Sequence, residues 1–145
     1  MASTAHKIYR GLDPEKRTVS NLKVAGAYLP GTFCTASATT LTQATAGTGR
    51  LFILSNRDFY DHDIDNAYAS GDTAVAYEIA PTDKFIGRFA AATYTYGQEL
   101  TVAASGRLAA AASTNVVVGF YSGTGVALSA GEFDEFVVAN SYTKA

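Results

Sequence analysis

The sequence predicts an all-β protein, a compact β-barrel or sandwich of short antiparallel strands with an extended N-terminal arm. From residue 22 onward, short apolar or β-branched segments end at Gly, Asn, Asp or Ser about every 8–12 residues. No amphipathic segment of ordinary helix length occurs. The 145 residues suffice for one core without a disulfide, and Cys34 is the only cysteine. We therefore expect an arm over residues 1–23 and a single β domain over residues 24–145.

The first half of the predicted domain contains three extended segments. Residues 24–29 end at a Pro-Gly pair, a strong turn signal. Residues 32–49 are rich in Thr and Ala without apolar periodicity, which predicts either an extended surface loop or an irregular edge strand. Residues 51–54 are all apolar and predict a buried strand, while residues 73–79 alternate and predict a strand with one buried face. An acidic loop connects these two strands.

The second half predicts five more strands. The Ala-rich run at 108–112 favours a helix by propensity, but it follows a Ser-Gly turn and is too short to be stable as an isolated helix. We therefore assign it to a strand whose small side chains let a neighbour approach closely. The five strands are expected at residues 85–91, 99–103, 107–111, 116–121 and 133–138.

The charge distribution separates the arm from the domain. Charged residues make up 17% of the chain, against about 25% in typical domains. The first 23 residues hold five Lys/Arg and two Asp/Glu (net +3), which leaves six and eleven (net −5) for the remainder. An acidic body repels phosphates, so we expect no direct nucleic-acid binding. Because no apolar run reaches about 20 residues and no secretory signal is evident, we expect no membrane association.

The sequence contains no constellation typical of an enzyme. His62 lies between Asp61 and Asp63, but no G-x-S-x-G elbow accompanies it, and the nearest string, ending at Ser122-Gly123, has the wrong spacing. Cys34 follows Phe33 in an apolar segment, which favours packing over nucleophilic chemistry. The Gly-x-Gly turns lack the P-loop lysine, and one Cys with two His cannot form a zinc site. We expect a non-enzymatic protein without a cofactor.

The acidic loop partly matches a calcium-loop template. Asp61, Asp63, Asp65 and Asp72 occupy positions 1, 3, 5 and 12 of that template. Position 6 is Asn66 instead of glycine, position 12 is Asp instead of a bidentate Glu, and flanking helices are missing. We expect a solvated acidic loop, with a calcium site or a contact to a basic partner surface as the alternatives.

The aromatic residues raise a second function. The chain has nine Tyr, eight Phe and no Trp, and Tyr94 and Tyr96 alternate with threonines, which places both on one face of a predicted strand. Such a face suits sugar stacking, and cross-strand packing explains it equally well. A β-sandwich recognition module that binds host glycan is therefore the alternative function.

The strand and turn pattern also resembles a known family. Residues 96–108 read YGQELTVAASGRL, and a VVVGF strand, an AGE turn and a final aromatic/Val strand follow, while AYLPGT, VAY and KFIGRF precede them. Over about residues 24–142, this pattern resembles the small head decoration (cement) proteins of tailed bacteriophages. The turn glycines Gly97, Gly106, Gly119 and Gly131 match that pattern, whereas the acidic loop and the Thr-rich passage have no place in it.

The resemblance implies a virion structural protein. Members commonly sit as trimers on the outer surface of the expanded capsid, hold neighbouring capsomers together and reach the shell with an N-terminal arm. The implied partners are the major capsid protein and the chain itself in a homotrimer, and the implied location is the virion surface after synthesis in the host cytoplasm. An extended arm can add a strand to an exposed sheet edge. The candidate capsid-binding residues of the arm are Lys7, Ile8, Tyr9, Arg10, Leu12, Lys16 and Arg17.

Overall fold

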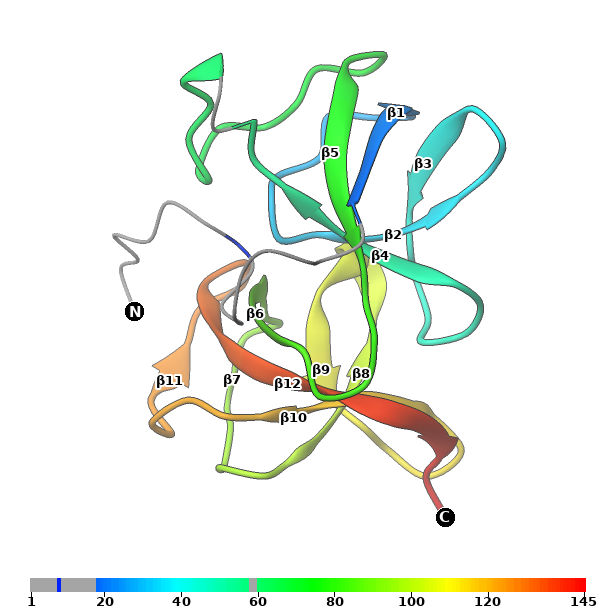
Figure 1. The fold of residues 1–145 in the computed structure, drawn as a ribbon. Helices are drawn as coiled ribbons and strands as arrows, with labels where there is room; N and C mark the ends of the chain where they lie inside the picture. The colour runs from blue at the N-terminus through cyan, green and yellow to red at the C-terminus, as the bar shows by residue number, and fades with distance from the viewer. Residues whose placement is uncertain (1–7, 9–17, 58–59) are drawn as a thin grey trace.

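A computed structural model describes residue 8 and residues 18–57 and 60–145 (Figure 1). The predicted all-β class is confirmed, because these residues form a closed barrel, a five-stranded sheet and a two-stranded ribbon. A short 3-10 turn, η2 (Ala104–Gly106), interrupts the second sheet. In the part of the chain that the structure describes, no helix has the length and apolar character to span a membrane.

The barrel is formed by the first five strands in the order β1-β3-β2-β4-β5. It closes because β1 pairs in parallel with β3 on one side and antiparallel with β5 on the other. Closure leaves these strands without a long free edge. The strands are β1 (Thr18–Val24), β2 (Phe33–Ala36), β3 (Thr40–Gln43), β4 (Leu51–Ser55) and β5 (Thr73–Glu78).

Strand β4 shows why one apolar run has no alternation. Phe52 and Leu54 point into the barrel interior, whereas Leu51 and Ile53 belong to the core shared with the second sheet. All five residues of β4 are buried as a result. The predicted buried strand at 51–54 is confirmed, and its two buried faces are the physical reason for its composition.

The predicted end of the arm at residue 23 is wrong, because residues 18–23 belong to β1. Here Leu22 pairs with Ala74 of β5 and is buried in the barrel. The polar residues of this segment point to solvent and hide the strand from a hydropathy pattern. The expected extended segment at 24–29 is also wrong beyond Val24, where the strand ends, although the turn at Pro30-Gly31 is present.

The Thr-rich passage at 32–49 is neither a surface loop nor one irregular strand, because β2 and β3 form a hairpin within it. The Ser37 hydroxyl accepts the N–H of Thr40 at 3.0 Å and closes the tight turn. Three residues per strand pair across this hairpin. Strands of four residues are too short to show a clear alternation of apolar and polar residues, and their positions depend on their pairing partners. The sequence therefore contains no periodic signal for β2 and β3.

The second sheet has the order β6-β12-β10-β8-β9. All five strands predicted for the C-terminal half are present, but β12 continues to Thr143 because its end pairs with Val116 and Val117. A ribbon of two short strands, which the sequence did not predict, lies beside this sheet. The strands are β6 (Lys84–Arg88), β7 (Ala92–Thr93), β8 (Glu99–Val102), β9 (Leu108–Ala110), β10 (Val116–Tyr121), β11 (Ala127–Leu128) and β12 (Phe133–Thr143).

The outer edge of β6 joins the parts of the molecule. Its other side pairs with β12, so alternate N–H groups face outward. The N–H of Ile86 donates to the carbonyl of Ile8 at 3.0 Å, and that of Arg88 donates to Gly31 of the barrel at 3.3 Å. The chain continues this edge past β6, where the N–H of Ala90 donates to Leu108 of β9 at 2.8 Å. Three carbonyls from distant segments therefore cover one edge.

The side chain of Arg88 reinforces the same junction. It is 7% exposed, and its guanidinium donates to the carbonyls of Pro30 at 2.7 Å, Ile64 at 2.7 Å and Gly131 at 2.8 Å. The guanidinium also stacks 4.1 Å from the centre of the Phe133 ring. Hydrogen bonds from a charged donor are the stronger kind, and here they link the barrel, the acidic loop and the β11–β12 turn.

We predict that Arg88→Ala lowers the free energy of unfolding by about 3 kcal/mol or more, because two buried carbonyls and one partly buried carbonyl lose their donor. Arg88→Lys recovers only part of the loss, since one ammonium cannot span the fork of acceptors. Urea unfolding followed by circular dichroism measures both. Lys84→Ala is the control, because Lys84 lies on the same strand and is exposed. Equal losses for Lys84→Ala and Arg88→Ala would contradict the role of the Arg88 hydrogen bonds.

Candidate functional site

The candidate site is the place where the N-terminal segment meets the body, together with the adjoining acidic loop. Ile8 is fully buried and belongs to the core shared by the barrel and the second sheet. Its carbonyl accepts the N–H of Ile86 on the β6 edge. The side chain of Ile8, which the sequence assigns to the capsid-binding arm, lies inside the protein's own core, and its contact with a capsid stays a prediction. The other predicted arm residues lie outside the described residues: Lys7, Tyr9, Arg10, Leu12, Lys16 and Arg17.

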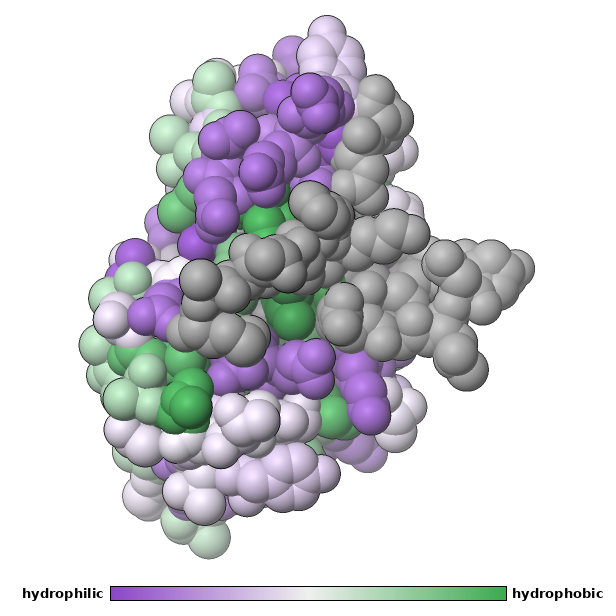
Figure 2. All heavy atoms as spheres, turned by 90° about the vertical axis from the view of Figure 1, so that its left-hand side faces the viewer, coloured by the Kyte–Doolittle hydropathy of each residue, from purple (hydrophilic) through white to green (hydrophobic). Residues whose placement is uncertain are grey.

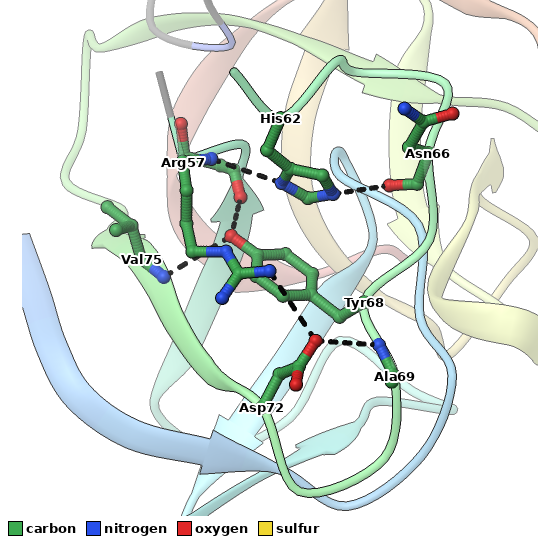
Figure 3. A network of polar contacts seen from close by, with 8 residues as sticks. Arg57, His62, Asn66, Tyr68, Ala69, Asp72 and Val75 are labelled. Carbon is green, nitrogen blue, oxygen red and sulfur yellow. Dashed lines mark hydrogen bonds and ion pairs between the residues drawn. The ribbon is translucent and has the colours of Figure 1, made fainter. Parts of the chain in front are cut away.

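His62 organises the acidic loop between β4 and β5 (Figure 3). Its Nδ1 accepts the backbone N–H of Arg57 at 3.1 Å, and its Nε2 lies 2.7 Å from the carbonyl of Asn66. These partners define a neutral ring with the proton on Nε2. Because both ring nitrogens bind backbone groups, His62 has no nitrogen free to activate a serine.

Tyr68 and Arg57 complete the same network. The fully buried Tyr68 packs edge-on against His62, with ring centroids 4.6 Å apart, and donates its hydroxyl to the carbonyl of Ser55. The guanidinium of Arg57 lies 5.0 Å from the centre of the Tyr68 ring. Sequence reasoning missed both residues. A tyrosine and an arginine flanking an acidic segment were the available signal, but their contacts depend on how the loop folds back.

The loop presents its carboxylates to solvent. Asp61, Asp63 and Asp65 are exposed, while the intervening Ile64 is 1% exposed and lies in the shared core. In the side view of Figure 2, hydrophilic residues gather over the upper part of the face to which this loop belongs. An anchored loop with outward acidic side chains is therefore a negatively charged surface that a basic partner can contact.

The four aspartates of the calcium template do not converge. Asp72 accepts the N–H of Ala69 at 3.0 Å and lies 3.4 Å from the Arg57 guanidinium. Asp65 lies 3.4 Å from the guanidinium of Arg88. Within residues 18–57 and 60–145, no group of three or more His, Cys, Asp or Glu side chains is placed to hold a metal ion. The geometry thus gives Asp65 and Asp72 arginine partners and leaves Asp61 and Asp63 exposed, without a shared ligand position.

We predict that calcium at millimolar concentration leaves the melting temperature within about 1 °C of its calcium-free value, because a ligand stabilises only the state that it binds. Differential scanning fluorimetry in calcium and in magnesium measures this, and magnesium controls for ionic strength. A rise specific to calcium that disappears in Asp63→Asn would restore the ion-binding interpretation.

Cys34 is a packing residue in the barrel interior, as the sequence indicated. It is fully buried, and its sulfur lies 4.0 Å from the carbonyl of Thr32. Burial raises the pKa of the Cys34 thiol from 9.0 to about 12. The reactive thiolate is therefore a minor species in the folded protein at neutral pH.

This raised pKa predicts a loss of stability at high pH. Above pH 9 the unfolded chain releases the thiol proton while the folded chain keeps it, so stability is fully present below pH 9 and falls between pH 9 and about 12. Relative to Cys34→Ala, the wild type should lose roughly 1.4 kcal/mol per pH unit in that window. Urea midpoints of both proteins at pH 8, 10 and 11 measure the difference. Parallel pH profiles would contradict it.

The prediction that Tyr94 and Tyr96 share one exposed face is wrong. Tyr94 is 1% exposed and donates its hydroxyl to the carbonyl of Ala90 at 2.8 Å, whereas Tyr96 is 76% exposed in the turn that follows β7. The strand ends at Thr93, so the period-two alternation does not extend over both tyrosines. Tyr94 packs against Phe89 and Tyr121 in the core. Packing between strands, the second explanation offered by the sequence, therefore explains the position of Tyr94.

A groove of about 400 Å³ lies between the β3–β4 loop and the second sheet. Its wall contains no charged or aromatic side chain, so it offers neither an anion site nor a stacking platform. Sequence reasoning did not find it. Its residues are Thr45, Ala46, Gly47, Thr48, Thr101, Val102, Ala103, Ala104, Thr114, Asn115 and Val116.

Comparison of the chain with protein-family models and with curated proteins found no match.

Proposed function

We propose that this protein is a virion structural protein, a head decoration (cement) protein that binds the outer surface of a tailed-phage capsid as a homotrimer and stabilises contacts between capsomers. The proposed partner is the major capsid protein. The family resemblance of the strand and turn pattern supports this proposal, and the function requires no catalytic site. The bound particle would be the expanded head in the assembled virion.

The observation that carries the proposal is the anchoring of Ile8. A basic segment that begins at a fixed point on a rigid β body is the arrangement that a surface-binding arm needs. Ile8 is buried and its carbonyl accepts the N–H of Ile86 on the β6 edge, so the chain has a fixed point on the body before β1 begins.

Two of the glycines on which the resemblance depends are required by close packing in this fold. Gly106 has φ +63, and a Cβ at this residue would lie 2.7 Å from the carbonyl oxygen of Phe33 in the barrel. A Cβ on Gly119 would lie 2.7 Å from the carbonyl oxygen of Val137 on the neighbouring strand. Both contacts lie below the normal approach of a side chain to a backbone oxygen. The assignment of Gly119 to a turn is wrong, because it lies within β10, where close approach of β12 requires a glycine.

Trimerisation and lattice binding would reinforce one another. Each copy contributes a net charge of −2 and few charged groups, which favours close repeated contacts between neutral surfaces. A trimer that contacts several capsomers converts three weak contacts into one strong attachment, because the second and third contacts become intramolecular. This multivalency explains how small neutral interfaces would suffice.

The test is binding to expanded heads of the phage that encodes the chain, prepared without this protein. Reversing two arm charges, Lys16→Glu with Arg17→Glu, should weaken co-sedimentation with heads by about tenfold or more, because charges at an interface steer and hold the partner. Charge reversal keeps the fold intact, whereas removal of residues 1–20 would take away part of β1.

The matched control is Lys23→Glu with Lys84→Glu, which changes the net charge equally at two exposed positions on the body. Light scattering should give a mass near three times 15.2 kDa for the wild type and both variants. Wild-type protein that fails to bind heads would refute the proposed function. Equal weakening by both double variants would refute the role of the arm.

A further inference from the structure

His62 binds both backbone groups of Arg57, a residue just beyond the end of β4 (Figure 3). The Nδ1 atom of its ring accepts the N–H of Arg57 at 3.1 Å, and its own backbone N–H donates to the carbonyl of Arg57 at 3.3 Å. These two hydrogen bonds close a turn between positions 57 and 62. The start of the acidic loop is thereby fixed to the end of a barrel strand.

The closed turn contains backbone strain that its surroundings must hold. Asp61 has a φ of 54°, in the left-handed region that residues other than glycine rarely adopt. The side-chain amide of Asn56 donates to the carbonyl of His62 at 2.9 Å, and the ring of Tyr68 packs edge-on against the imidazole. A strained conformation persists only while neighbouring contacts impose it, so the loss of one contact at His62 favours opening of the turn.

Only a neutral imidazole fits this arrangement. Nδ1 faces an N–H donor and must therefore be without a proton, whereas Nε2 lies 2.7 Å from the carbonyl of Asn66 and carries a proton in either charge state. Protonation of the His62 ring places a second N–H against the N–H of Arg57, which replaces a hydrogen bond with a repulsive contact. Histidine is the side chain that ordinarily changes charge between about pH 5 and 8.

The charged groups around His62 do not compensate a protonated ring. Asp65 and Asp72 lie against arginine guanidinium groups. Asp61 and Asp63 flank His62 in the chain and are exposed, so water and salt screen their charges. Among residues 18–57 and 60–145, no carboxylate forms an ion pair with the imidazole. The other charged or titratable groups of this network are the guanidinium of Arg57, which has the same sign of charge as an imidazolium, and the hydroxyls of Tyr60 and Tyr68.

We infer that His62 is a pH-sensitive latch on the acidic loop. The neutral ring holds the turn at Arg57 closed, and the protonated ring opens it. Because the exposed aspartates belong to this loop, acid changes the shape of the surface that a basic partner would contact. The inference concerns the chain by itself and does not rest on capsid binding.

Two substitutions separate the two hydrogen bonds of the ring. His62→Asn places an amide oxygen near the position of Nδ1, so it keeps an acceptor for the N–H of Arg57 and cannot take up a proton. His62→Gln reaches the position of Nε2 and the carbonyl of Asn66, but it leaves the N–H of Arg57 without that acceptor. His6→Asn is the matched control, because His6 is the only other histidine in the sequence.

The measurement is amide hydrogen exchange at Arg57 by NMR on the full-length proteins, with rates corrected for the intrinsic effect of pH. In the wild type and in His6→Asn, protection should fall on the order of tenfold from about pH 7.5 to about pH 5, because a hydrogen bond is lost. In His62→Asn, protection should change by less than about twofold. In His62→Gln, it should be low at both pH values.

The design separates the latch from other effects of acid. The aspartates of the loop are present in all four proteins, so a loss of protection caused by their protonation appears equally in each of them. An equal fall in the wild type and in His62→Asn therefore overturns the inference. Protection in the wild type that is the same at both pH values also overturns it.

A second measurement needs only the wild type. Long-range proton–nitrogen correlation spectra report the protonation of each ring nitrogen of His62, and the amide resonance of Arg57 is followed in the same pH titration. The inference requires a ring with its proton on Nε2 at about pH 7.5 and an Arg57 resonance that moves with the midpoint of the imidazole. A proton on Nδ1 at that pH, or an Arg57 resonance that stays in place while the ring is protonated, overturns the inference. Because neither experiment contains a capsid, failure here leaves the proposed function standing.

Discussion

The β6 edge is the constraint on which the rest of the structure depends. The outward N–H groups of Ile86 and Arg88 belong to buried residues, so each must find a carbonyl from another segment. Ile8 and Gly31 supply two of these carbonyls along β6, and Leu108 supplies a third where the chain continues past the strand. Arg88 repeats the principle with its side chain, since its buried charge is balanced by three carbonyls and by Asp65. One short strand thereby decides how the barrel, the acidic loop and the N-terminal segment meet.

This junction also organises the electrostatics of the molecule. The acidic loop is attached at Ile64, whose carbonyl binds Arg88, and by the network around His62. Its aspartates are consequently displayed on a surface with a defined shape. Four of the five Lys/Arg residues among the first 23 precede β1 in the sequence, whereas the acidic loop follows β4. The two signs of charge are therefore carried by separate segments. Separated charge of this kind suits a protein that contacts different partner surfaces.

The buried position of Ile8 fixes the N-terminal part of the chain to the body at one residue. The β6 edge is covered at that point, because the N–H of Ile86 donates to the carbonyl of Ile8. A fixed point of this kind suits the arm that the proposed function requires. In a lattice of many copies, contacts of modest strength would be sufficient because they act together.

The sequence by itself determined the all-β class, most strand positions, the turn at Pro30-Gly31 and the packing role of Cys34, because alternation, apolar runs and turn residues are local signals. It did not reveal β1, whose polar residues face solvent, or the short pairing of β2 with β3. Tertiary structure alone decided that Ile8 is a core residue, that Tyr94 is buried and that Asp65 and Asp72 face arginines. The reason is physical: each of these outcomes depends on a partner far away in the chain, and a local pattern carries no information about which distant group will satisfy a buried donor or fill a pocket.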